Sequence, residues 1–159
     1  MPDLLSHVLI GLILAELFNV KKKSLVVLGA IAPDILSKFY LIYFYFNLPP
    51  IISFVPFHTQ VMMFLLSIVI APLFRQDNVK IILLFNLGAM SHILADLTMK
   101  HFTVMGSRIF FPFDMSNYTL NLIWPDDSLF ILLGCFVIYI IIRSIKGNLN
   151  SGMEISKTI

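Results

Sequence analysis

The sequence predicts an all-α integral membrane protein, a bundle of about five helices with a broken second helix. Hydrophobic residues make up 58% and charged residues only 13% of the 159 residues, whereas soluble domains average roughly 45–50% and 25%. The mean hydropathy is +0.92. The apolar residues form five segments, about 4–18, 25–46, 51–74, 81–99 and 129–142. We expect one membrane-embedded domain over 1–146 and a polar C-terminal tail over 147–159.

The first segment is short, because a helix needs about 20 residues to cross a hydrocarbon core of about 30 Å. Met1-Pro2-Asp3 lacks the basic region of a signal peptide, so we expect a retained helix whose start is capped by this sequence. Glu16 lies close to Lys21–Lys23. It is expected at the membrane boundary.

The second segment is long enough to span but contains Pro33, followed by Asp34. Proline removes a backbone hydrogen bond and clashes with the preceding turn. We therefore predict a broken helix around residues 29–34, and the segment ends at Asn47-Leu48-Pro49-Pro50. Irregular backbone at that depth is tolerated only where it is buried in protein or lines a cavity.

The third and fourth segments, 51–74 and 81–99, are predicted to be full spans. The fifth, 129–142, is short and follows the helix-capping sequence Pro125-Asp126-Asp127-Ser128. The single Cys135 excludes an intramolecular disulfide framework.

Orientation follows from basic residues near the span ends, which favour the cytoplasmic side. With five spans, one side carries Lys21, Lys22, Lys23, Arg75, Lys80, Arg143 and Lys146. We expect this side to face the cytoplasm.

No basic run alternates with aromatic residues, so docked nucleic acid is not expected. Membrane lipid is the expected partner, and the oligomeric state is open.

The fourth segment carries two ionisable residues. His92 and Asp96 are four residues apart and share one face of a helix. They lie roughly 18 Å and 24 Å above Lys80 along the helix axis. Asp34 lies roughly 14 Å above Leu25 by the same rise per residue. Ionisable residues inside membrane segments are rare and usually mark a functional site.

Imidazoles and carboxylates from four segments thus converge on the outer, non-cytoplasmic half of the bundle. Such groups are ligands of zinc, manganese and iron, and a nearby dication keeps a buried carboxylate charged. A divalent metal, zinc in the first place, is therefore the expected cofactor. The predicted ligands are His7, Asp34, His58, His92 and Asp96.

Structural alternatives stay open for each ligand. A histidine at a helix end can lie at the membrane interface, and a His/Asp pair can clamp helices together by a hydrogen bond. Asp34 can pair with Lys38 one turn away.

The loop after the fourth segment adds two candidate catalytic residues. His101 is a proton shuttle or further ligand, and Arg108 is a clamp for an anionic substrate.

Several sequence elements together resemble a known family, the YdjM-like membrane-bound proteins predicted to be metal-dependent hydrolases. The matching elements are Pro2-Asp3-Leu4-Leu5-Ser6-His7, Gly29-Ala30-Ile31-Ala32-Pro33-Asp34, His58-Thr59, Gly88-Ala89-Met90-Ser91-His92-Ile93-Leu94-Ala95-Asp96-Leu97-Thr98 and Phe111-Pro112-Phe113. The order of ligands is also similar to that of the zinc-dependent phospholipase C and single-strand nuclease superfamily. This chain lacks the ligating N-terminal tryptophan of those enzymes, so the number of metals is open.

The resemblance implies hydrolysis of a phosphodiester or ester, such as that of a lipid head group. A metal supplies an activated water near neutral pH and polarises the oxygen of the scissile bond. A lipid substrate reaches a pocket at this depth by lateral diffusion. The alternatives are a membrane protein that binds or transports a metal ion or protons without hydrolysis, and a purely structural bundle.

Overall fold

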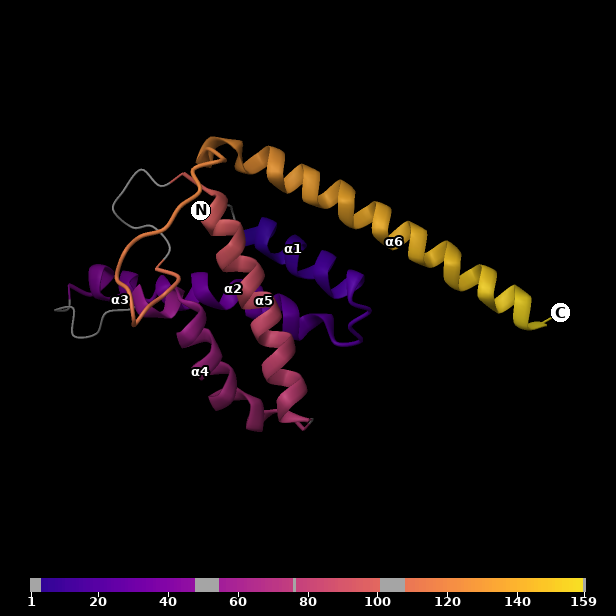
Figure 1. The fold of residues 1–159 in the computed structure, drawn as a ribbon, viewed down its shortest axis with the longest axis horizontal. Helices are drawn as coiled ribbons and strands as arrows, with labels where there is room; N and C mark the ends of the chain where they lie inside the picture. Colours follow the sequence, from indigo (N-terminus) through magenta and orange to yellow (C-terminus); the bar gives the residue numbers. More distant parts are fainter. Residues whose placement is uncertain (1–3, 48–54, 76, 101–107, 159) are drawn as a thin grey trace.

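The computed structural model describes residues 4–47, 55–75, 77–100 and 108–158. The α-helices in these ranges are α1 Leu4–Leu17, α2 Lys23–Ser37, α3 Tyr40–Tyr45, α4 Gln60–Ile70, α5 Asn78–Thr98 and α6 Ser128–Thr158 (Figure 1). Short 3-10 helices are η1 Val55–His58, η2 Ala71–Leu73 and η3 Pro125–Asp127. Over the described residues the chain is helical without a named strand, and the predicted all-α class is confirmed.

Within the described ranges, three helical stretches are long and apolar enough to cross a membrane, so the chain is an integral membrane protein. They are Lys23–Tyr43, Asn78–Thr98 and Pro125–Gly147. Two shorter apolar helices, Leu4–Leu17 and Gln60–Leu73, accompany them. The predictions for the first, second and fourth segments agree with these lengths, whereas the third and fifth need correction.

The third segment is shorter than predicted. Its α-helix begins at Gln60 and has 11 residues before it tightens into η2. Thr59 defines this start, because its hydroxyl accepts a hydrogen bond from the Met62 backbone at 3.4 Å. The same hydroxyl donates to the Pro56 carbonyl oxygen at 2.7 Å. An N-cap of this kind ends the preceding 3-10 turn and fixes where the α-helix starts.

The fifth segment is longer than predicted. Helix α6 starts at Ser128, after η3, and continues to Thr158. No proline follows Pro125 in the chain, so no residue of the tail removes a backbone hydrogen bond of the helix in the way that proline does. Helix α6 thus continues into the predicted polar tail over 147–159 as far as Thr158.

The second segment is broken, as predicted, but at a different place. Helix α2 continues through Pro33, and the helical pattern is interrupted at Lys38 and Phe39, before α3. The prediction of a break at 29–34 is wrong, because one missing backbone hydrogen bond is tolerated where neighbouring helices support the turn. Helix α5 supplies this support along the length of α2.

The core of the bundle is the contact between α2 and α5, which cross in the middle of Figure 1. A Cβ atom on Gly29 would overlap the Phe85 carbonyl oxygen, and one on Gly88 would overlap the Val26 carbonyl oxygen. Only glycine fits at both positions. Small residues let membrane helices approach closely, and here they bring the two backbones into direct contact.

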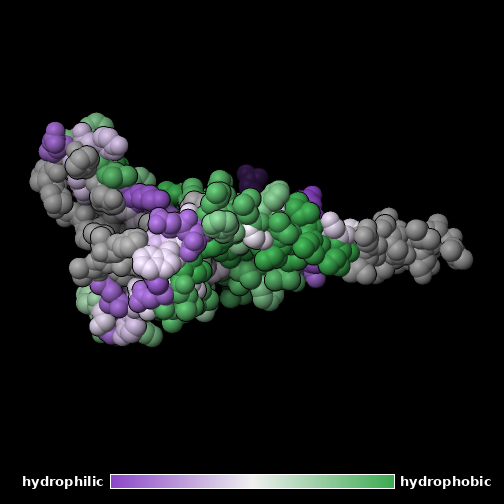
Figure 2. All heavy atoms as spheres, turned by 90° about the horizontal axis from the view of Figure 1, so that it is seen from above, coloured by the Kyte–Doolittle hydropathy of each residue, from purple (hydrophilic) through white to green (hydrophobic). Residues whose placement is uncertain are grey.

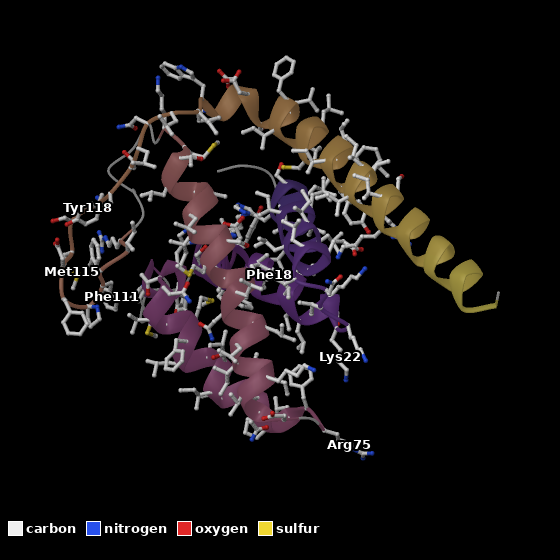
Figure 3. The ribbon with its side chains drawn as sticks, turned by 45° about the vertical axis from the view of Figure 1, so that its right-hand side comes forward. Phe18, Lys22, Arg75, Phe111, Met115 and Tyr118 are labelled. Atoms are coloured by element: carbon white, nitrogen blue, oxygen red, sulfur yellow. The ribbon has the colours of Figure 1, made fainter. Side chains whose placement is uncertain are left out.

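The outer surface is apolar where the helices would meet lipid. Figure 2 shows hydrophobic side chains along α6, with hydrophilic side chains gathered over the loop before it. The span Pro125–Gly147 is 0% buried. Lys22 and Arg75 lie at one end of the bundle, and Phe111, Met115 and Tyr118 lie at the other (Figure 3). The separation matches the predicted asymmetry of basic residues.

Candidate metal centre

Four ionisable side chains meet in the interior, and they come from α2, η1 and α5. Asp34, His58, His92 and Asp96 each offer a ligand atom, and these atoms all lie within 4.8 Å of one another. Ligand atoms of one tetrahedral zinc ion lie about 3.3–3.6 Å apart, because each bond is about 2.0–2.2 Å long. The cluster would have to contract by about 1 Å to enclose such a cation.

Asp96 is the centre of this cluster. His58 Nε2 lies 2.7 Å from Asp96 Oδ2, and His92 Nε2 lies 3.4 Å from the same oxygen. His7 Nε2 approaches the other oxygen, Oδ1, at 3.4 Å. The carboxylate is 1% exposed, so imidazole nitrogens rather than water surround it.

His7 joins the cluster from α1. Its side chain is fully buried, and its ring stacks on that of His92 with 3.9 Å between centroids. Among the described residues neither ring nitrogen has a hydrogen-bond partner. All five predicted ligands therefore lie together, four in one group and His7 against it.

The orientation of His92 is fixed by α2. His92 Nδ1 lies 2.7 Å from the Ala30 carbonyl oxygen, and because a carbonyl only accepts, the proton is on Nδ1. In the neutral ring, the lone pair of Nε2 then faces Asp96 and also Asp34, whose Oδ1 lies at 3.9 Å. Such a bond from the outer nitrogen holds a ligating imidazole in one tautomer. The role of Ala30 was not predicted, although Gly88, one turn before His92, signals the close approach of α2 and α5 that makes the bond possible.

Asp34 also faces Lys38, whose Nζ lies 3.7 Å from Asp34 Oδ2. The pairing left open as an alternative is thus present. Lys38 is about half exposed, while Asp34 is buried. The lysine therefore offsets part of the negative charge from one side and leaves Asp34 Oδ1 turned towards His92.

A second feature that was not predicted from the sequence is a chain of hydrogen bonds between polar side chains of α4 and α5, which we call the polar bridge. Gln60 donates to Asn86 Oδ1 at 3.0 Å, and Asn86 donates to Ser67 Oγ at 2.8 Å. These hydrogen bonds connect α4 to α5, and Gln60 lies two residues after His58 in the chain. The sequence signal for this bridge was a single asparagine, Asn86, in the apolar segment 81–99.

The chemistry of the cluster fits a divalent cation. Several of its buried atoms have no hydrogen-bond partner within the described part of the chain, namely His7 Nδ1 and Nε2, Asp34 Oδ1 and Oδ2, His58 Nδ1, His92 Nε2 and Asp96 Oδ1. Unsatisfied buried polar atoms are costly and rare in native proteins. A cation held by imidazole nitrogens and carboxylate oxygens satisfies many of them at once.

The two candidate catalytic residues of the loop remain predictions. His101 lies outside the described residues. Arg108 lies in the loop after α5, where its Nε donates to Asn117 Oδ1 at 3.4 Å. Nearby, hydrogen bonds from the Tyr118 hydroxyl and then from Ser116 lower the pKa of Asp114 to about 2. That carboxylate is already engaged within its own loop.

The chain matches a known protein family over nearly its whole length. The model of a family described as YdjM inner membrane protein matches residues 1–155. The match includes all five residues of the cluster and extends beyond the motifs that carry the resemblance. No curated protein and no solved structure matches the chain.

Proposed function

The chain belongs to the YdjM inner membrane protein family, and we propose that it is a membrane-bound, metal-dependent hydrolase. Its substrate is a phosphodiester or ester such as that of a lipid head group. The observation that carries the proposal is the group of four ligand atoms within 4.8 Å of one another. A structural clamp needs one hydrogen-bonded pair, whereas this cluster keeps several buried atoms without a hydrogen-bond partner among the residues that the structure describes.

The chain's own residues have separate parts in this proposal. Asp34, His58, His92 and Asp96 hold the cation, and His7 completes the group. The bound cation, zinc in the first place, supplies Lewis-acid activation of a water and of the scissile oxygen. The Ala30 carbonyl keeps His92 Nε2 aimed at the site. His58 is the most accessible member, at 17% exposed against 1% or less for the others. The substrate therefore approaches from the His58 side.

We also propose that the site opens towards the non-cytoplasmic side. His92 and Asp96 lie in the last two turns of α5, which ends at Thr98. The basic residues Lys22 and Arg75 lie at the opposite end of the bundle (Figure 3). Since basic residues favour the cytoplasmic side, the end of α5 that carries the cluster faces away from the cytoplasm.

Metal analysis of the detergent-purified protein tests the centre. We expect about one or more metal ions per chain in the wild type, and their loss in Asp34→Ala and Asp96→Ala while both variants keep their helical content. Asp77→Ala is the matched control, because Asp77 is an exposed cap of α5 that accepts from Val79 and should leave the metal in place. A wild type without bound metal contradicts the proposal.

Activity assays separate hydrolysis from transport. The metal-loaded protein in liposomes should cleave an ester or phosphodiester lipid and should lose this activity on chelation. Metal or proton flux without turnover of any such lipid would instead assign the same residues to an ion pathway.

A further inference from the structure

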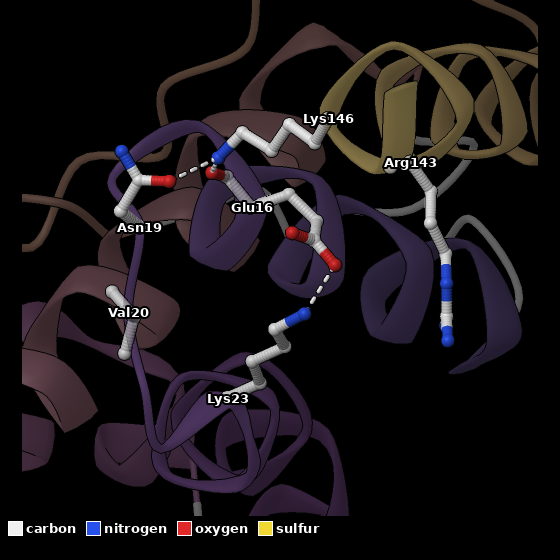
Figure 4. A pocket seen from close by; sticks show the side chains of 7 residues that line it. Glu16, Asn19, Val20, Lys23, Arg143 and Lys146 are labelled. Atoms are coloured by element: carbon white, nitrogen blue, oxygen red, sulfur yellow. Dashed lines mark hydrogen bonds and ion pairs between the residues drawn. The ribbon is translucent and has the colours of Figure 1, made fainter. Parts of the chain in front are cut away.

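A second cluster of charged residues lies away from the metal centre, where α1, α2 and α6 come together. It surrounds a hollow of about 360 Å³ (Figure 4). The residues that line this hollow are Glu16, Asn19, Val20, Lys23, Arg143, Lys146 and Gly147. We call it the basic hollow.

The basic hollow is built by contacts between distant parts of the chain. Lys23 at the start of α2 forms an ion pair with Glu16 near the end of α1. Lys146 of α6 donates to the Glu16 carbonyl oxygen and to Asn19 Oδ1. Figure 4 shows the ammonium groups of Lys23 and Lys146 both pointing towards Glu16. Two lysines from different helices are therefore held at one place.

The charge of the basic hollow is not balanced by its own residues. Lys23, Arg143 and Lys146 carry three positive charges and Glu16 one negative charge, which leaves a formal charge of +2. Lys21 and Lys22 directly precede Lys23 in the chain. A hollow of this charge selects an anion.

Exposed apolar residues are next in the sequence to residues that line the basic hollow. Leu17 and Phe18 follow Glu16 and are 55% and 64% exposed, and Ile145 precedes Lys146 and is 56% exposed. Leu17 ends α1, and Ile145 lies near the end of the apolar stretch Pro125–Gly147. The end of a membrane-spanning stretch is where lipid head groups meet acyl chains. An anion with attached hydrocarbon fits this surface better than a free ion does.

We propose that the basic hollow binds the phosphate group of an anionic phospholipid and thereby holds α6 against the bundle. Basic pockets between membrane helices on the cytoplasmic side bind such head groups. The phosphate contacts Arg143 and Lys146 of α6 together with Lys23 of α2, so one lipid bridges two helices. Arg143 is exposed, and its hydrogen bond at 2.9 Å goes to Tyr139 of its own helix, so it can turn towards the phosphate without breaking a contact between helices.

Native mass spectrometry of the full-length protein in detergent tests the proposal with phosphatidylglycerol as the probe. We expect Arg143→Gln/Lys146→Gln to bind this lipid about 25-fold more weakly than wild type, since each basic residue near a membrane surface contributes about fivefold. Arg75→Gln/Lys80→Gln removes the same charge away from the hollow and should bind like wild type. If the double variant fails to fold, Arg143→Gln alone should show about a fivefold loss, because this exposed residue has no part in the core.

Glu16→Gln should change the affinity for the lipid in the opposite direction. It removes the carboxylate that competes with the phosphate, and the affinity for phosphatidylglycerol should rise. Equal binding of phosphatidylglycerol by wild type and all variants would overturn the proposal. So would equal binding of zwitterionic phosphatidylcholine, or displacement of the lipid by equimolar inorganic phosphate. Metal content should stay at the wild-type level in every variant, so the outcome is independent of the proposed hydrolase.

Discussion

The candidate metal centre and the basic hollow are two groups of charged residues inside one apolar bundle, and they differ in how their charges are satisfied. At the basic hollow, the buried carboxylate of Glu16 is paired with the ammonium group of Lys23. At the metal centre, Asp96 meets only imidazoles among its described ion pairs, and several neighbouring atoms lack a partner. An acid in an apolar helix is therefore a weak sign of metal binding by itself. Convergent ligands with unsatisfied atoms are a stronger one.

The two groups also depend on different helix contacts. The metal centre needs α2 and α5 in close contact, whereas the basic hollow needs α6 packed on α1. Substitutions that separate the first pair should spare the second, and this allows the comparison to be tested one contact at a time.

The largest effect is expected from Gly88→Ala. The new methyl group would overlap the Val26 carbonyl oxygen, and overpacking a rigid contact of this kind costs about 3 kcal/mol. The variant should lose bound metal and unfold at lower temperature, as measured by metal analysis and by thermal unfolding in detergent. Gly134→Ala is the control, because nothing lies within 4 Å of its added methyl. A Gly88→Ala protein with normal metal content would show that the α2–α5 contact does not position the ligands.

The next effect is the stabilisation by added metal. A ligand at 100 times its Kd stabilises the folded state by about 2.7 kcal/mol, so zinc added to the metal-free wild type should raise its melting temperature. Asp96→Asn should not respond, because it replaces the carboxylate at the centre of the cluster. Glu16→Gln should respond like wild type. If zinc raised the melting temperature of Asp96→Asn as well, the cation would be binding elsewhere.

The sequence predicted the fold class because composition and segment length are sums over many residues. The spacing of His92 and Asp96 alone predicted that they share one helix face. His58 was predicted to lie in the same outer half of the bundle as these two residues. Helix ends were less predictable. The capping of α4 by Thr59 is a local hydrogen bond within a continuous apolar run, and α6 continues into polar residues where nothing breaks it.

The remaining features of the site depend on tertiary contacts, which the spacing of residues along the sequence does not reveal. The Ala30 carbonyl is a backbone group, and only the close approach of α2 and α5 brings it to His92. The bridge between Gln60, Asn86 and Ser67 likewise requires the register of α4 on α5. Whether the cluster binds a metal stays a prediction.

A smaller effect is expected from Asn86→Ala, which removes this bridge. Hydrogen bonds between membrane helices contribute on average about 0.6 kcal/mol, so stability should change little. Metal affinity should fall about tenfold, the lower end for the loss of groups that support ligands, because α4 directly follows η1, whose last residue is His58. Competition with a chelator measures this affinity. Ser116→Ala, in the distant loop, should leave it unchanged, and an unaltered affinity in Asn86→Ala would assign the bridge to helix packing alone.

The smallest effect concerns the loop that contains Asp114. Hydrogen bonds from Tyr118 and Ser116, at 2.6 Å and 2.8 Å, lower the pKa of this exposed carboxyl from its ordinary 3.8 to about 2. A lowered pKa in the folded state means that the ordered loop is favoured above about pH 4 and loses this preference as the pH falls through about 2. Hydrogen exchange of the Ser116 amide should therefore speed up relative to neighbouring amides in acid, and in Asp114→Asn this pH dependence should disappear. The metal content of Asp114→Asn at neutral pH should equal that of wild type, because both carboxylate oxygens are already bonded within the loop. Loss of metal in this variant would instead make Asp114 part of the centre and remove the distinction between satisfied and unsatisfied acids.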